Sequence, residues 1–191
     1  MKWYEIEIAG LRRRLPVVEV SEGVRIASNA RLVLGDIEFC EKVAEELANR
    51  MRRVDVIVCP ESKAICLGAF LCRRAGVKEM VIARKSIKAY MQEPISVRVR
   101  SITTKGEQLL VLDSHDVRRI RGKRVALFDD VISTGGTMKG LLELVEKAGG
   151  KVKRIVTVWL EGPWPWKEFG EYIKSGKLVY LDTLPVMEGR G

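Results

Sequence analysis

The chain has 191 residues, and 47% of them are hydrophobic, which is enough for one domain with a sizeable core. No run of about 18 apolar residues occurs, as a membrane-spanning helix would need, and the first residues lack the basic-then-apolar order of a signal peptide. We therefore expect a soluble, cytoplasmic protein without a membrane partner. The net charge of +9 favours a polyanionic ligand of one of three kinds: a phosphorylated metabolite, a nucleic acid or an acidic surface.

Cysteine, asparagine and glutamine usage gives two further expectations. The four cysteines form no CxxC pair and have no histidine at metal-ligand spacing, so they suggest neither zinc nor a disulfide framework and are expected to be buried thiols. Asparagine and glutamine are rare while Lys, Arg and Glu are abundant, a composition typical of heat-adapted proteins. This predicts a thermophilic source, and a melting temperature in the ordinary mesophile range would contradict it.

The two ends of the chain, residues 1–35 and 161–191, lie outside the alternating pattern of its middle. Together they contain three strand-like runs, Glu5–Ile8, Val17–Val20 and Val179–Leu184. We expect the two ends to pack together as a small hood over a core formed by residues 36–160.

In the middle of the chain, apolar runs alternate with amphipathic stretches. In chain order the expected elements are a strand at Val54–Cys59, a helix at Lys63–Ala75, a strand at Met80–Ala83, a strand at Arg124–Phe128, a helix at Gly136–Ala148 and a strand at Val152–Leu160. Two βαβ units of this kind predict an α/β fold, in which a mostly parallel, twisted sheet is covered by helices on both faces. Between the units, Ile95–Ile102 and Gln108–Asp113 predict an antiparallel hairpin with a flexible tip, a shape that often serves as a lid.

One segment carries the clearest chemistry. The predicted strand that begins at Arg124 runs straight into Asp129 and Asp130 and is followed by the run Ser133-Thr134-Gly135-Gly136-Thr137 and a helix. Glycines allow a tight turn in which backbone N–H groups, hydroxyls and the positive end of the helix converge on a phosphate. The carboxylates would repel that phosphate, so we expect them to bind sugar hydroxyls or, through water, Mg²⁺. An ordinary helix cap explains one hydroxyl residue but not the whole run.

This segment resembles the phosphoribosyl-pyrophosphate motif of the type I phosphoribosyltransferases. The likeness extends, with gaps, from about Gly23 to about Leu160, and is nearest to the adenine phosphoribosyltransferase branch. It implies the fold of that family and an enzyme that transfers a 5-phosphoribosyl group from phosphoribosyl pyrophosphate to a nucleobase. The resemblance further implies purine salvage, release of pyrophosphate, Mg²⁺ as cofactor and a homodimer, with adenine as the first expectation for the base.

The resemblance also gives roles to residues outside this segment. The pyrophosphate loop of the family corresponds to Glu61, Ser62 and Lys63, and its basic Arg-Lys-x-x-Lys signature corresponds to Arg84, Lys85 and Lys88. The hood residues expected against the nucleobase are Val24, Arg25 and Ile26. The residues expected at the reacting centre are Asp129, Asp130 and Lys105, with Arg100 and Thr104 beside Lys105 on the lid. Taken alone, the first loop would be a helix cap and the basic signature a solvated surface.

Several functions remain open at this point. The lid tip has Thr104-Lys105-Gly106 where the adenine branch has Glu-Tyr-Gly, which favours a phosphoribosyl-pyrophosphate-binding regulator without efficient catalysis. Ser133 replaces the aspartate that is usual in hypoxanthine and guanine enzymes, and the Lys-x-x-x-Lys-Asp-His-Gly pattern of orotate enzymes is absent. The basic stretch at 118–124 leaves a nucleic-acid-binding protein as the least favoured reading.

Overall fold

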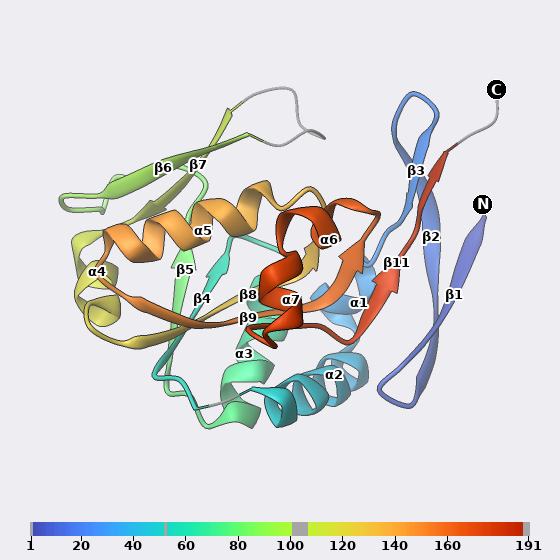
Figure 1. The fold of residues 1–191 in the computed structure, drawn as a ribbon, viewed down its shortest axis with the longest axis horizontal. Coiled ribbons are helices and arrows are strands. Elements are labelled where there is room, and N and C mark those ends of the chain that lie inside the picture. Colours follow the sequence, from blue (N-terminus) through green and yellow to red (C-terminus); the bar gives the residue numbers. More distant parts are fainter. Residues whose placement is uncertain (1, 52, 101–106, 189–191) are drawn as a thin grey trace.

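The computed structural model describes residues 2–51, 53–100 and 107–188, and within them the apolar runs of the middle of the chain form one parallel sheet (Figure 1). Its strands are β4 (Val56–Pro60), β5 (Glu79–Ala83), β8 (Arg124–Ile132), β9 (Lys151–Glu161), β10 (Leu178–Val179) and β11 (Asp182–Leu184). The strand order is β10-β9-β8-β4-β5, and β11 also pairs with β9. Because every pair is parallel, the carboxyl ends of the strands share one edge of the sheet.

Both faces of the sheet are buried, which explains why its strands are continuous apolar runs. Alternate residues of β4 face opposite sides, so that Ile57 and Val58 belong to two different hydrophobic clusters. Helices α2 (Ile37–Arg50) and α3 (Ala64–Ala75) cover one face, and α5 (Gly136–Lys147) covers the other (Figure 1). The predicted fold class is confirmed.

The predicted antiparallel hairpin is also present. Strands β6 (Ile95–Arg100) and β7 (Glu107–Leu112) pair with each other and lie over α5 (Figure 1). Gly140 allows this close packing, since a Cβ atom there would collide with the side chain of Val99 and lie 3.0 Å from that of Leu110. The tip of the hairpin, residues 101–106, lies outside the described residues.

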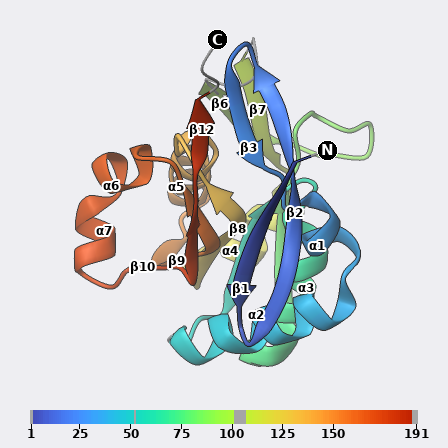
Figure 2. The same ribbon diagram turned by 90° about the vertical axis from the view of Figure 1, so that its right-hand side faces the viewer.

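A second, four-stranded sheet joins the two ends of the chain (Figure 2). It consists of β1 (Trp3–Ile8), β2 (Leu11–Ser21), β3 (Val24–Ala27) and β12 (Val186–Glu188). Strand β12 pairs antiparallel with β3, and Val186 is opposite Ile26. We call these four strands the hood. Of the described C-terminal strands, β12 joins this sheet, whereas β10 and β11 pair with β9 of the central sheet. The division of the chain into hood and core at residues 35 and 160 stays a prediction.

The remaining helices are short: α1 (Ala30–Gly35), α4 (Ser114–Ile120), α6 (Trp164–Glu168) and α7 (Gly170–Lys174). In the described part of the chain, no helix has the length and apolar character that crossing a bilayer requires. The cysteines are free thiols, as expected; Cys40, Cys59 and Cys72 are buried, whereas Cys66 is half-buried.

Candidate functional site

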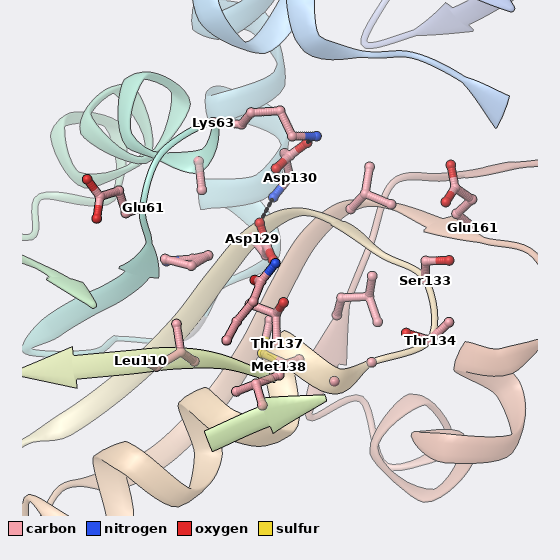
Figure 3. Close-up of a pocket in the computed structure, with 18 of the residues that line it drawn as sticks. Glu61, Lys63, Leu110, Asp129, Asp130, Ser133, Thr134, Thr137, Met138 and Glu161 are labelled. Atoms are coloured by element: carbon pink, nitrogen blue, oxygen red, sulfur yellow. Dashed lines mark hydrogen bonds and ion pairs between the residues drawn. The ribbon is translucent and has the colours of Figure 1, made fainter. Parts of the chain in front are cut away.

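A pocket of about 350 Å³ lies at the carboxyl edge of the central sheet, where β4, β8 and β9 end (Figure 3). The central sheet contributes residues in the last part of its strands or just after them, at 60–64, 85, 129–138 and 161. The hood contributes Val20 and Ile26, and the hairpin contributes Val99, Gln108 and Leu110. The pocket thus has a polar floor at the sheet edge and largely apolar walls from the hood and the hairpin.

The run from Ser133 to Thr137 lines the pocket and leads into the first turn of α5. Gly135 adopts a left-handed conformation with φ +82°, and a Cβ atom there would lie 2.5 Å from the ring of Phe169. Both the backbone conformation and the available space therefore require glycine at this position. The resulting turn directs hydroxyls and the positive end of a twelve-residue helix toward the pocket, which makes an anion site.

Asp130, whose side chain is only 4% exposed, forms a hydrogen-bonded triangle with Asn29 and Lys63. Its Oδ2 atom accepts hydrogen bonds from Asn29 Nδ2 at 2.5 Å and from Lys63 Nζ at 2.8 Å. Lys63 Nζ also donates to Asn29 Oδ1 at 3.1 Å, which closes the triangle. The negative charge of Asp130 is thus balanced by a cation from the loop after β4.

Asp129 is in a different environment from its neighbour. Its Oδ1 atom accepts the backbone N–H of Asp130 at 2.9 Å. Burial and, next, the nearby charge of Asp130 raise the pKa of Asp129 well above its usual range. The two adjacent acids therefore differ, because Asp130 has a cationic partner at contact distance whereas the carboxyl of Asp129 is held in a site that disfavours its charge.

The loop after β4 is tied to the segment after β5 through Glu61. Glu61 Oε2 accepts hydrogen bonds from the backbone N–H of Lys85 at 3.0 Å and from Arg84 Nε at 3.2 Å. These donors, led by the Lys85 backbone, lower the pKa of Glu61. The peptide bond between Glu61 and Ser62 is cis. This loop, together with the ammonium of Lys63, forms the side of the pocket next to β4.

Only some of the predicted basic residues line the pocket. Lys85 lines the pocket, whereas Arg84 and Lys88 are not among its lining residues. The guanidinium of Arg84 contacts Glu61 and donates to the hydroxyl of Tyr90 at 2.8 Å, and Lys88 Nζ donates to Ser86 Oγ at 2.6 Å. The structure therefore brings Lys63 and Lys85 to the pocket from this group of cations.

Of the β3 residues predicted to contact the nucleobase, one lines the pocket and two do not. Ile26 lines the pocket, but Val24 and Arg25 do not. Strand residues alternate between faces, so Arg25 projects away from the side of Ile26, and its Nε atom lies 3.3 Å from Glu19 Oε2. Lys105 and Thr104 lie outside the described residues, as does the side chain of Arg100.

Comparison with known proteins settles the family. A model of the phosphoribosyl transferase domain matches residues 34–179. The chain belongs to this phosphoribosyltransferase family. It is 32% identical over 126 residues to a hypoxanthine/guanine phosphoribosyltransferase from Methanothermobacter thermautotrophicus, an alignment that covers 65% of this chain and 61% of that protein. It is 34% identical to an adenine phosphoribosyltransferase from Thermosipho africanus, with 63% and 68% covered. The match with the first of these relatives thus spans about three fifths of its length.

Solved adenine phosphoribosyltransferases have the same fold. The structure from Thermoanaerobacter pseudethanolicus has a TM-score of 0.72 and 25% identity, and covers 88% of this chain and 95% of its own. The Trypanosoma brucei enzyme, solved with AMP, pyrophosphate and ribose-5-phosphate, has a TM-score of 0.67 and 19% identity, and the match covers 95% and 75% of the two chains. The resemblance on which the sequence analysis relied is thereby confirmed at the level of family and fold.

Glu161, Asn29 and Val20 are among the lining or supporting residues that are absent from the sequence prediction. Glu161 lines the pocket and is 8% exposed; burial raises its pKa, against a hydrogen bond from Ser133 and the charge of Lys63, which lower it. An acid directly after an apolar parallel strand is the same signal that identified Asp129, so Glu161 was detectable. Asn29 and Val20 have no such signal, because their roles depend on contacts with distant segments.

Proposed function

We propose that this protein transfers the 5-phosphoribosyl group of phosphoribosyl pyrophosphate to a purine base and releases pyrophosphate. The arrangement of charge in the pocket is the observation that supports this function. The anion site at 133–137 and the cations Lys63 and Lys85 both line the pocket, and Figure 3 shows Asp129 and Asp130 between Lys63 and Thr137. Phosphoribosyl pyrophosphate has the matching order of groups: a phosphate, a ribose with free hydroxyls and a pyrophosphate.

Each part of the substrate then has a partner in the pocket. The 5-phosphate binds the N–H groups and hydroxyls of the turn from Thr134 to Thr137. The ribose hydroxyls donate to the carboxylates of Asp129 and Asp130. The pyrophosphate binds between the ammonium groups of Lys63 and Lys85, beside the loop after β4.

Catalysis in this arrangement is mainly electrostatic. When a ring nitrogen of the base displaces pyrophosphate from C1 of the ribose, positive charge develops on the sugar and negative charge on the leaving group. Asp129 and Asp130 stabilise the first charge, and Lys63 and Lys85 stabilise the second. No side chain acts as a nucleophile, and the apolar walls from the hood and the hairpin limit the access of water to the reacting centre.

The residues fit Mg²⁺ as an ion held chiefly by the substrate. No group of three or more His, Cys, Asp or Glu side chains able to hold a metal occurs in the described ranges, and the adjacent carboxylates that line the pocket are those of Asp129 and Asp130. Mg²⁺ keeps several waters and is usually bound by one or two carboxylates together with substrate phosphates, which agrees with this donor set. We propose that Asp129 and Asp130 contact the ion through water, where it neutralises charge on the pyrophosphate.

A panel of bases tests the proposed activity. Adenine, guanine, hypoxanthine, xanthine, uracil and orotate are each supplied with phosphoribosyl pyrophosphate and Mg²⁺, and pyrophosphate release is measured. We expect turnover with a purine. Replacing both acids, Asp129→Asn with Asp130→Asn, should abolish turnover, because the ribose loses the two carboxylates that bind it. Circular dichroism should show an intact fold.

Asp182→Asn, on β11 outside the pocket, is the matched control and should keep the activity of the unchanged protein. Unaltered turnover in the double variant would disprove the assigned site. Tight binding of phosphoribosyl pyrophosphate without turnover on any base would instead favour the regulator that remained open from the sequence.

A further inference from the structure

Glu161 is a pocket residue that the chemistry above does not use. Glu161 is only 8% exposed, and the Ser133 side chain lies close enough to lower the pKa of its carboxyl against the larger, opposite effect of burial. None of the ion pairs found among residues 2–51, 53–100 and 107–188 includes it, and Lys63, the nearby cation, contacts Asp130 instead. A carboxylate has about four acceptor positions, and that of Glu161 lines the pocket. Glu161 therefore has acceptor capacity directed at whatever enters the pocket.

The sheet register places Glu161 beside the anion site. Ile132 of β8 is opposite Leu160 of β9, so the next residues, Ser133 and Glu161, lie side by side at the edge of the sheet. Figure 3 shows these two side chains together at one side of the pocket, away from Lys63 and Glu61. This is the side opposite the proposed pyrophosphate position.

The following residue links Glu161 to the hood. The N–H of Gly162 donates to the carbonyl of Leu184 at 3.0 Å, and a Cβ atom on Gly162 would lie 3.0 Å from the side chain of Val186 in β12. Glu161 thus lies at the junction between the anion site and the hood, whose apolar residues Val20 and Ile26 face the same pocket. An apolar wall beside a polar pair suits a flat heteroaromatic ring with a hydrogen-bonding edge.

The polar pair has a defined pattern: the Ser133 hydroxyl is a donor, and the Glu161 carboxylate is an acceptor. An edge that matches it must present an acceptor next to a donor. The N7 and N6 atoms of a 6-aminopurine do so, whereas N7 and O6 of a 6-oxopurine are both acceptors. Orotate has a carboxylate of its own, which Glu161 would repel.

We propose that Glu161, together with Ser133, is the specificity-determining pair of this site and selects a 6-aminopurine over a 6-oxopurine. Glu161 accepts a hydrogen bond from the exocyclic amine, and the Ser133 hydroxyl turns from Glu161 to donate to N7. This inference rests on the proposed function and adds the identity of the base to it.

Binding of AMP and IMP tests the inference, because around the purine N7 edge these nucleotides differ in the group at C6. Dissociation constants are measured at pH 8 for the unchanged protein, for Glu161→Gln and for the control Glu143→Gln on the exposed side of α5. The unchanged protein should prefer AMP. In Glu161→Gln the amide can donate to O6, so the preference for AMP should fall by roughly tenfold or more. Glu143→Gln should keep the original ratio.

A second variant covers the possibility that Glu161→Gln fails to fold. Glu161→Asp withdraws the carboxylate by one methylene, so AMP binding should weaken with no gain for IMP. An unchanged AMP-to-IMP ratio in Glu161→Gln, unchanged AMP binding in Glu161→Asp, or a preference of the unchanged protein for IMP would each overturn the inference and leave the proposed function standing. If the unchanged protein binds neither nucleotide, the proposed function fails, and the inference fails with it.

Discussion

Asp129 combines a proposed role in the function with an unfavourable effect on stability. Because burial and Asp130 raise its pKa, the folded protein holds this proton more tightly than the unfolded chain does. The associated stability is fully present below the ordinary pKa of an aspartate, about 4, and is lost as the pH rises through the higher value of the folded state. Ionisation of Asp129 therefore lowers the stability of the free protein.

We predict that Asp129→Asn stabilises the protein by roughly 1–3 kcal/mol at pH 8 while it lowers turnover. The amide oxygen can still accept the backbone N–H of Asp130, so the local structure is retained. Urea unfolding at pH 4, 6 and 8 measures the effect, which should shrink toward pH 4. A variant that is less stable than the unchanged protein at pH 8 would show that the carboxylate is stabilised by its surroundings.

The hairpin of β6 and β7 packs closely against α5. Val99 and Leu110 of the hairpin line the pocket and also meet α5 at Gly140. Any side chain at position 140 therefore pushes the hairpin outward and moves one wall of the site. The favourable effect of replacing a helical glycine is below about 1 kcal/mol, which is smaller than the usual penalty for overpacking.

We predict that Gly140→Val lowers the free energy of unfolding by about 1–3 kcal/mol and weakens ligand binding. Gly35→Val is the matched control, because it also lies in a helix and a Cβ atom there would meet nothing within 4 Å. Its effect on stability should stay within about 0.5 kcal/mol. Urea unfolding and the dissociation constant of phosphoribosyl pyrophosphate report the two effects. Equal stability of the two variants would mean that the hairpin adjusts without loss.

At the scale of the whole molecule, the hood is completed by strand β12, which pairs with β3 from the other end of the sequence (Figure 2). The anion site, in contrast, is built on β8 and α5 alone. Removing residues 186–191 should therefore expose the edge of β3 and lower AMP affinity by roughly tenfold, equivalent to 1.4 kcal/mol. Ribose 5-phosphate, which needs no hood, should bind as before. Equal losses for both ligands would show that the two parts of the site are not separable.

The homodimer and the thermophilic source expected from the sequence stay predictions at this scale. Size-exclusion chromatography and thermal denaturation test them directly.

The sequence predicts the central sheet well because its strands are buried on both faces and appear as apolar runs. It places the end of β8 at Phe128, whereas the strand continues to Ile132, since β9 stays paired with it through Val131 and Ile132. Alternation along β3 puts Arg25 and Ile26 on opposite faces of the strand. The sequence does not tell which of the two faces the pocket, and the structure shows that it is Ile26. The triangle around Asp130 joins residues up to 101 positions apart, and no local pattern predicts such a contact.

That triangle has a consequence for how ligands bind. Asn29 follows the last strand of the N-terminal hairpin of the hood, so its bonds to Lys63 and Asp130 fasten the hood to the pyrophosphate loop. A ligand that draws the Lys63 ammonium onto phosphate oxygens takes a partner from Asn29 at the same time. We therefore predict that binding of phosphoribosyl pyrophosphate and binding of the proposed base are thermodynamically linked, so that each affinity depends on whether the other ligand is present.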